Sequence, residues 1–577
     1  MNLPSFNIPN NIPQIQVQSS VNDSISHSDA YHQETISHDT NSRGKNGASV
    51  IFDDNLIVEE NKESKCGKRF SWSGGKESFK KKFRRIGYNF RKFIRFAGPG
   101  YLIAVGYLDP GNWATDLSGG SQFGYSLLFI VFCSNLMAML LQGLSVKLGI
   151  VTGLDLASAC RMYFNKWTNY ILYVLCELAI IACDLAEVIG SAIALNLLFK
   201  IPLPWGVAIT ATDVMFLLLF YRDDSLKAAR LLETLVMFLV GTVGMCFILE
   251  LAYSKPNSVD VLRGYLPSSG IFTDTEQLYV AIGIIGATVM PHNIYLHSHL
   301  VKVRKNKEHI DGFNAMIEKE DNGETPPTTA EVFKKVTYST IKMSVLDSSV
   351  ALTFALFVNS AILIVAAANF FYSDSQQEVA DLFDAHRLLS RYLSPAAGIL
   401  FALALLIAGQ SSTLTATMAG QVVMEGFTGW RIRPWLRRLI TRGLAIIPAM
   451  AIAIIKGPSG LNSLLVASQV ALSIQLPFAV IPLVYFTAHP KVMRIDTENV
   501  RNKLLRDGNG TDNDRSDENN GRDNNMSGDN KDSVVDFRNP LWLTIIAGII
   551  SLIILGLDCY LVVTTIKDAI VGEESIE

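Results

Sequence analysis

The residues of this chain that could bind a ligand gather in two short motifs inside apolar stretches. The first motif, AVGYLDPGNWATD over residues 104–116, contains Asp109, Pro110 and Asn112. Proline removes a backbone donor and clashes with the preceding turn, so a helix should break here. A broken helix is tolerated in a membrane only where the freed carbonyls line a cavity or contact a ligand. The motif therefore predicts a binding site, and a proline kink with a paired aspartate is the plainer alternative.

The second motif repeats the same device in the sixth apolar stretch. It reads GATVMPHN over residues 286–293 and contains Met290, Pro291 and Asn293. Both motifs have the form X-Pro-X-Asn. Matched, proline-interrupted segments in two halves of a chain are the best sequence indication of a transporter site. We therefore predict five-plus-five inverted repeats, in which the two breaks face each other at the middle of the membrane.

The residue types in the two motifs favour a divalent transition metal as the ligand. Asp109 offers an anionic oxygen, Asn112 an amide oxygen and Ala287 a backbone carbonyl. Oxygen ligands alone would suit Mg²⁺ or Ca²⁺, whereas the thioether of Met290 favours Mn²⁺, Fe²⁺, Co²⁺ or Cd²⁺. A methionine in an apolar stretch more often fills a core. Its place directly before the helix-breaking proline favours the ligand interpretation.

A second group of residues could carry protons. Asp184 and Glu187 stand three positions apart in the third apolar stretch, so they share one helix face. Burial and mutual repulsion favour the protonated form of one of them, as a proton carrier requires. Arg442, in the ninth stretch, is the natural counter-charge. The alternative is a buried salt bridge that holds helices three and nine together, and both interpretations can hold.

The elements that must position these residues are membrane-spanning helices. The chain has 577 residues, of which 49% are hydrophobic and only 18% charged. Runs of about 20 apolar residues would be covered only by lipid, which excludes a soluble enzyme. The sequence predicts an all-α polytopic membrane protein with eleven spans. Their limits are 94–118, 126–148, 169–199, 204–221, 231–253, 278–300, 341–369, 392–425, 437–456, 461–486 and 541–566.

Charge and composition predict how these spans are arranged in the membrane. Most of the 50 lysines and arginines face the cytosol if the N-terminus is cytosolic, as the positive-inside rule requires. Two polar tracts, 1–92 and 487–540, cannot bury enough apolar surface to fold and are predicted to be disordered. The predicted parts are a cytosolic tail (1–92), a first five-helix repeat (93–255), an external loop (256–277), a second repeat (278–486), a cytosolic linker (487–540), and an eleventh helix with a short external C-terminus (541–577).

At the two motifs the chain resembles the Nramp family, the proton-coupled divalent-metal transporters of the natural resistance-associated macrophage protein type. The resemblance covers residues 94–486, whereas the Asn- and Asp-rich tails and the eleventh span look like those of fungal members. The matching residues are Asp109–Asp116, Ala287–Asn293 continuing through Ser298, Gly409–Thr413, Gly420, Gln421 and Met424–Phe427.

The resemblance implies a LeuT-like fold and a function. The expected function is proton-coupled transport of Mn²⁺ or Fe²⁺, and also Co²⁺ and Cd²⁺, into the cytosol by alternating access, with no enzymatic activity and no resident cofactor. The implied metal ligands are Asp109, Asn112, Ala287, Met290 and, in one conformation, Gln469. The implied proton pathway contains Asp109, Asp184, Glu187 and Arg442, with roles in pH dependence for His292 and His297.

Two other functions remain open at this point, and several partners are expected. A metal-sensing receptor could use the same scaffold. A di-iron membrane oxygenase would need several separate histidine clusters, and only one lies in the predicted membrane part of this chain, which has nine histidines. No basic domain indicates nucleic acid. We expect the protein to lie in a plasma, endosomal or vacuolar membrane. Ubiquitin-ligase adaptors are expected partners of the tails, whose lysines can accept ubiquitin, as lysines of any disordered tail would.

Overall fold

The structure is a computed structural model, and its described residues all belong to one compact unit, Asn89–Glu577. The tail 1–92, most of the linker 487–540 and parts of the first and fifth predicted spans lie outside the described residues. The described residues are 103, 106–220, 238, 241–242, 244–249, 251–302, 328–372, 381–392, 394–430, 432–497 and 534–574.

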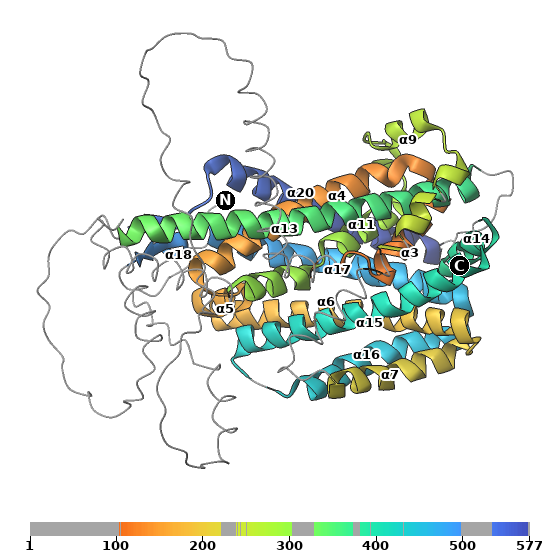
Figure 1. Cartoon of the computed structure of the whole chain (residues 1–577), viewed down its shortest axis with the longest axis horizontal. Helices are drawn as coiled ribbons and strands as arrows, with labels where there is room; N and C mark the ends of the chain where they lie inside the picture. The colour runs from red at the N-terminus through yellow and green to blue at the C-terminus, as the bar shows by residue number, and fades with distance from the viewer. Residues whose placement is uncertain are drawn as a thin grey trace, which may run out of the picture. The chain divides into compact units, whose positions relative to one another are not determined.

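Helices make up almost all of the described structure (Figure 1). A single two-stranded antiparallel sheet, β1 (Arg494–Asp496) with β2 (Val534–Asp536), joins the two ends of the linker region within this part of the chain. The helices are α3 (Pro110–Phe123), η1 (Gly124–Leu127), α4 (Leu128–Thr152), α5 (Leu156–Tyr163), α6 (Lys166–Phe199), α7 (Leu203–Phe220), α9 (Ser258–Gly264), α10 (Gly270–Thr273), α11 (Thr275–Val289), α13 (Thr329–Ala366), η2 (Ala367–Phe371), α14 (Leu382–Tyr392), α15 (Pro395–Thr428), α16 (Pro434–Ile455), α17 (Gly457–Ala488), α18 (Pro490–Met493) and α20 (Leu541–Glu574).

Eight helical segments of the described chain are long and apolar enough to cross a membrane. Helix α7, which is not one of these eight segments, also matches the predicted fourth span. Helix α13 begins at Thr329, well before the predicted limit of 341, because Thr328 and Glu331 form a capping box at its start. The eight segments are Pro110–Thr152, Lys166–Phe199, Thr275–Lys302, Ala330–Phe371, Pro395–Thr428, Leu436–Ile455, Gly457–Ala488 and Leu541–Thr564.

The break in the first span is a helix start. Asp109 is the N-cap of α3, and its carboxylate accepts a hydrogen bond of 2.9 Å from the backbone N–H of Asn112. Pro110 occupies the first turn, where a proline has no hydrogen bond to lose. The sequence D-P-G-N thus begins a helix with the aspartate side chain fixed at its N-terminus, and the predicted break is confirmed.

The break in the sixth span is confirmed as well. Helix α11 ends at Val289, Met290 has φ 37° and ψ 102°, and the helix resumes from Pro291 to Lys302. A positive φ at a residue with a side chain costs on the order of 1–3 kcal/mol. Such strain persists only where the surroundings hold it. Because Pro291 has no N–H, the Ala287 carbonyl is left without its helical partner.

Close packing of α11 on α17 fixes the second break in place. A methyl group at Gly286 would overlap the backbone oxygen of Gln469 and lie 2.6 Å from the backbone nitrogen of Ser473. Helices in membranes approach this closely only where a residue is small. Because Gly286 directly precedes Ala287, this contact determines where the Ala287 carbonyl lies.

Gly286→Ala is therefore expected to displace α17 from α11 and to abolish the metal transport that the resemblance implies. The added methyl group meets backbone atoms, which cannot move without moving a helix. Gly283→Ala is the matched control, since a methyl group there would lie 3.5 Å from its nearest neighbours, an ordinary contact. Thermal stability and metal uptake of both purified variants test this. Equal behaviour of the two variants would contradict the packing argument.

Candidate functional site

The two helix breaks meet at one asparagine. The Nδ2 group of Asn112 donates hydrogen bonds to Asp109 Oδ1 at 2.7 Å and to the backbone oxygen of Ala287 at 3.0 Å. Asp109 and Asn112 are 1% and 2% exposed, and Ala287 is fully buried. The structure thus brings three of the predicted ligand positions, from two distant parts of the chain, into direct contact.

The arrangement around this asparagine is suited to a cation. An N–H₂ group, the positive end of an amide dipole, lies between a carboxylate oxygen and a backbone oxygen. Asp109 Oδ2 is buried without a hydrogen-bond partner among the described residues. Rotation of the Asn112 amide by half a turn would direct its oxygen toward Asp109 Oδ1 and the backbone oxygen of Ala287. Three oxygens, one of them anionic, would then converge on one point.

Met290 and Gln469 lie at the edges of this cluster. The Sδ atom of Met290, fully buried, accepts a hydrogen bond of 3.3 Å from Asn293 Nδ2. The Gln469 amide packs against Gly111, where a methyl group would overlap it, and Gln469 Oε1 has no partner within the described structure. Close to the two breaks, Met290 thus offers a soft sulfur and Gln469 a neutral oxygen as possible metal ligands.

Asn359 of α13 joins the cluster from a third direction. Its Nδ2 lies 3.5 Å from Asn112 Oδ1 and 3.5 Å from the backbone oxygen of Tyr107. The sequence does not distinguish Asn359 from any other polar residue in an apolar stretch. Its role in orienting the Asn112 amide emerges only from the packing of α13 on α3.

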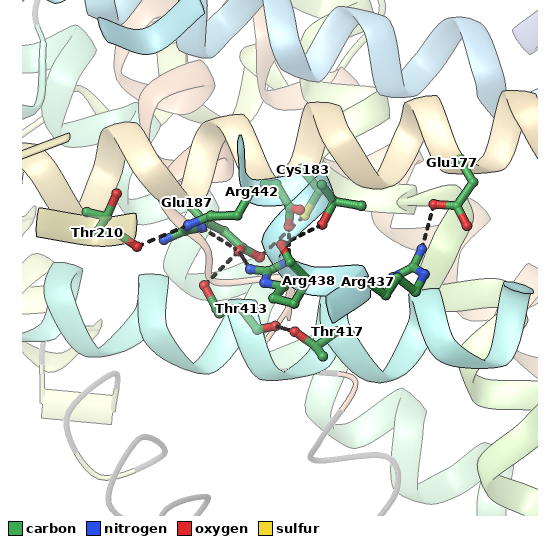
Figure 2. A network of polar contacts seen from close by, with 11 residues as sticks. Glu177, Cys183, Glu187, Thr210, Thr413, Thr417, Arg437, Arg438 and Arg442 are labelled. Atoms are coloured by element: carbon green, nitrogen blue, oxygen red, sulfur yellow. Dashed lines mark hydrogen bonds and ion pairs between the residues drawn. The ribbon is translucent and has the colours of Figure 1, made fainter. Parts of the chain in front are cut away.

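An ion-pair network connects α6 to α16 (Figure 2). The guanidinium of Arg438 bridges Asp184 and Glu187, at 2.8 Å from the Oε2 atom of Glu187. Thr413 of α15 donates a hydrogen bond of 2.7 Å to the same oxygen. All three charged side chains are 1% exposed or less, so the network lies in a region that water does not reach.

The predicted counter-charge, Arg442, is the more distant of two arginines. Its Nη1 lies 3.4 Å from Glu187 Oε2, and its Nε donates to the backbone oxygen of Thr210 at 3.4 Å. The primary partner of both carboxylates is Arg438, which the sequence analysis did not assign to the network. The spacing of Arg438 and Arg442 by four residues, which places both on one face of α16, is the signal that would have found it.

A further ion pair extends this network along the same two helices. Arg437 Nη2 lies 2.5 Å from Glu177 Oε2, and the two side chains are 6% and 18% exposed (Figure 2). Glu177, Asp184 and Glu187 thus form a row on α6, matched by basic residues of α16. A row of titratable groups can pass protons along a helix in steps.

The two histidines of the second motif have different surroundings. His292 is 2% exposed, and its Nδ1 has no hydrogen-bond partner in the described part of the chain. His297 Nδ1 lies 2.8 Å from Gln142 Oε1, whose amide Nε2 donates to the Tyr107 hydroxyl at 2.9 Å. A chain of hydrogen bonds therefore leads from His297 to Tyr107, two residues before the N-cap of α3.

The last described residues of the second broken helix contact the loop before α5. Asp155 N-caps α5 and pairs with Lys302 at 3.1 Å and with His299 at 3.6 Å. Burial favours the protonated form of Asp155, but the nearby His299, the charge of Lys302 and the hydrogen bond from the Ser158 backbone N–H outweigh it. The pKa of this carboxyl is therefore well below its usual range, and the ion pair with Lys302 persists in mildly acidic conditions.

Comparison with known proteins identifies relatives over most of the chain. A family model described as natural resistance-associated macrophage protein-like matches residues 100–505. A divalent metal cation transporter from Nostoc sp. is 48% identical over 477 residues, which are 82% of this chain and 92% of the relative. One from Brucella suis is 51% identical over 410 residues, 71% and 84% of the two chains.

Solved structures agree with the sequence relatives. The crystal structure of a manganese transporter from Eremococcus coleocola superposes with a TM-score of 0.60 and 33% identity, over 81% of this chain and 86% of that one. The predicted helical integral membrane protein, with broken first and sixth spans and a helix over the eleventh predicted span, is confirmed. The relatives are transporters and not enzymes, as expected. The chain belongs to the Nramp family of natural resistance-associated macrophage protein-like transporters.

Proposed function

We propose that this protein is a proton-coupled transporter that carries divalent transition metals into the cytosol by alternating access. The proposed substrates are Mn²⁺ and Fe²⁺, with Co²⁺ and Cd²⁺ also accepted. The observation that supports this most strongly is the contact of Asn112 with both Asp109 and the Ala287 oxygen. It joins the two helix breaks at a buried point where the carboxylate has no basic partner among the described residues, so a metal ion or a proton would balance its charge. The names of the relatives, divalent metal cation transporters, agree with it.

The proposed metal ligands are Asp109, Asn112, the Ala287 carbonyl and Met290, with Gln469 added in one conformation. Asp109 supplies the negative charge, because desolvating a dication without an anionic ligand is very costly. The neutral oxygens complete the shell, and the Met290 sulfur selects against Ca²⁺ and Mg²⁺. Within the described residues no cluster of three His, Cys, Asp or Glu side chains could hold a metal. A site with one carboxylate releases its ion more readily than such a cluster would.

The proposed proton pathway runs from Asp109 to the α6 network. Binding of a dication requires Asp109 to be ionised, so metal binding releases a proton. Helix α6 packs directly on Pro110, since a methyl group at Gly190 would overlap the proline ring. Glu187 lies one turn before Gly190 and so faces the site. The proton would pass from Glu187 to Asp184, and Arg438 and Arg442 would stabilise the negative charge of these carboxylates. His292 and His297 would set the pH dependence of transport.

The breaks also provide the moving parts for alternating access. Residues at helix ends absorb the backbone rotation of a hinge more easily than residues inside a helix. Asp109 and Met290 occupy such positions, and α17, which carries Gln469, packs against both broken helices. Movement of α17 would add or remove the Gln469 ligand. A plasma, endosomal or vacuolar membrane, a cytosolic N-terminus and ubiquitin-ligase adaptors stay predictions from the sequence.

Uptake by purified protein in liposomes tests this proposal. We expect an inward pH gradient, acidic outside, to drive uptake of Mn²⁺ and Fe²⁺, with acidification of the lumen and no uptake of Mg²⁺. The alternative of a metal-sensing receptor predicts binding of Mn²⁺ by the purified protein without its movement across the membrane. Metal uptake that is independent of the proton gradient would overturn the coupling but not the transport.

Met290→Ala is expected to change selectivity more than activity. Loss of the sulfur leaves room for a water molecule, the hard ligand that Ca²⁺ and Mg²⁺ prefer. Cd²⁺ depends most on sulfur because it is soft. The variant should keep part of its Mn²⁺ uptake, lose much of its affinity for Cd²⁺, and transport Ca²⁺ or be blocked by it. Competition by Cd²⁺ and Ca²⁺ in the liposome assay measures this preference.

An unchanged ratio of Cd²⁺ to Ca²⁺ competition would show that the sulfur is not a ligand. Met290 would then be a core residue whose sulfur accepts the hydrogen bond from Asn293. Met139, a partly buried methionine of α4 in the hydrophobic core, offers a matched control. Met139→Ala removes the same side chain elsewhere in the protein and should leave the preference unaltered.

A further inference from the structure

The eleventh helix, α20, carries a buried carboxylate in its apolar part. Asp558 is 4% exposed, although many of the large apolar side chains of the same helix are exposed. Helix α20 lies beyond residues 100–505, which the family model matches. Carboxylates inside a membrane are costly and are retained where they perform a function. None of the metal and proton sites proposed above uses Asp558.

Asp558 is bound to α17. The Ser473 hydroxyl donates a hydrogen bond of 3.0 Å to Asp558 Oδ1, and Oδ2 has no hydrogen-bond partner in the described structure. No lysine or arginine of the described residues forms an ion pair with Asp558. An apolar cluster of Val470, Leu561 and Leu278 packs α20 against both α17 and α11. The hydrogen bond is thus the polar element of an otherwise apolar helix contact.

Ser473 connects this contact to the metal site. It follows Gln469 by one helical turn, and both residues pack against Gly286. Gly286 directly precedes Ala287, whose backbone oxygen accepts from Asn112. A shift of α17 along its axis would therefore move the Gln469 amide and release the Ala287 carbonyl from its present position.

We propose that Asp558 and Ser473 form a latch by which the eleventh helix positions α17 for metal binding. In a membrane, apolar surfaces gain little from contact with one another because lipid is equally apolar, so they fix the register of two helices poorly. A hydrogen bond between buried polar groups fixes one register, because every other register leaves both groups unpaired. The proposal rests on the proposed function. Asp558 acts through Gln469 and Ala287 as a positioning residue and does not contact the ion.

The latch needs a hydrogen-bond acceptor at position 558 and not a negative charge. This distinguishes it from a proton-carrying site on α20. Asp558→Asn keeps an acceptor oxygen and should behave like the wild type in both metal affinity and pH profile. Asp558→Ala removes the acceptor, and Ser473→Ala removes the donor.

The test compares the apparent KM for Mn²⁺ uptake of these variants in liposomes. Asp558→Ala and Ser473→Ala should each raise KM about fivefold, the effect of losing one hydrogen bond, with a smaller change in kcat. The double variant should be no worse than either single variant, because both remove the same interaction. Ser551→Ala is the matched control. The Ser551 hydroxyl is also buried on α20, but it bonds to the Ala547 carbonyl of its own helix.

A second measurement is independent of transport. Hydrogen exchange of the α17 amides around Gln469 should be faster in Asp558→Ala than in the wild type, and unchanged in Ser551→Ala. Failure of the wild type to transport metal would overturn the proposed function, while the exchange result would still decide the latch. Wild-type KM and exchange in Asp558→Ala would overturn the latch. A flattened pH profile in Asp558→Asn would show instead that Asp558 acts by its charge.

Discussion

Asp109→Ala is expected to reduce metal uptake to the background of protein-free liposomes while leaving the protein folded in the membrane. Asp109 is the one carboxylate among the proposed ligands, and the other donors are neutral. Their dipoles cannot replace the hydration that a dication loses on entering a buried site. The loss should be equally complete for Mn²⁺, Fe²⁺ and Cd²⁺, because it concerns charge and not the preference for oxygen or sulfur.

The design of this experiment must separate the two roles of Asp109. The side chain also caps α3, and loss of a cap costs about 0.5–2 kcal/mol by itself. Asp109→Asn keeps a good capping residue and removes only the charge, so we expect it to be as inactive as Asp109→Ala but more stable. Uptake assays and thermal unfolding measure the two effects independently.

Ser118→Ala provides the control on the same helix. The Ser118 hydroxyl is buried and has no hydrogen-bond partner in the described part of the chain. Its removal should change neither stability nor uptake by much. Near-normal Mn²⁺ uptake by Asp109→Asn would show that the metal binds elsewhere, and the proposed ligand set would be wrong.

Arg438→Ala is expected to be the most destabilising single substitution in the network of Figure 2. The guanidinium is 1% exposed and pairs with two carboxylates, Asp184 and Glu187, that are fully buried. Removal of one partner from a buried ion pair costs about 3–5 kcal/mol, because the remaining charge is buried with neither a partner nor water to stabilise it. Here two carboxylates lose their primary partner. A lower unfolding temperature in detergent and a lower yield of folded protein should follow.

Asp184→Asn tests the proton role of the same network with a smaller perturbation. It leaves Arg438 paired with Glu187, so the protein should fold. Metal binding should persist, since Asp184 lies on α6 and not on the helices that supply the main ligands. Uptake should become less dependent on the pH gradient, and Arg442→Ala should act in the same direction. A loss of Mn²⁺ affinity by orders of magnitude in either variant would assign these residues to the metal site.

Arg433→Ala is the control for the arginine substitutions. Arg433 precedes the first turn of α16, one turn before Arg437, but it is exposed. Substitution of an exposed arginine should change stability by less than about 0.5 kcal/mol. If Arg433→Ala and Arg438→Ala unfold at the same temperature, burial of the network contributes nothing to stability and its proposed energetics are wrong.

The sequence alone determined the features that depend on local chemistry. A proline removes a backbone donor, and at Asp109 and Met290 the polar residues beside it make a break predictable from a few neighbouring residues. Proline alone is not sufficient, since Pro448 lies inside α16. The length and polarity of the apolar stretches determined most spans in the same way, because lipid permits few alternatives. The residue types beside the breaks indicated a divalent transition metal before any contact was known.

Only the tertiary structure decided which distant side chains meet. The sequence pointed to Arg442 as the counter-charge and did not assign Arg438 to the network. The structure shows that α16 begins at Pro434, so Arg438 is buried one turn inside the helix and faces α6. The contact of Ser473 with Asp558 depends likewise on how two helices are rotated and shifted. Hydropathy does not encode that rotation, since it depends on which individual side chains of the two helices meet.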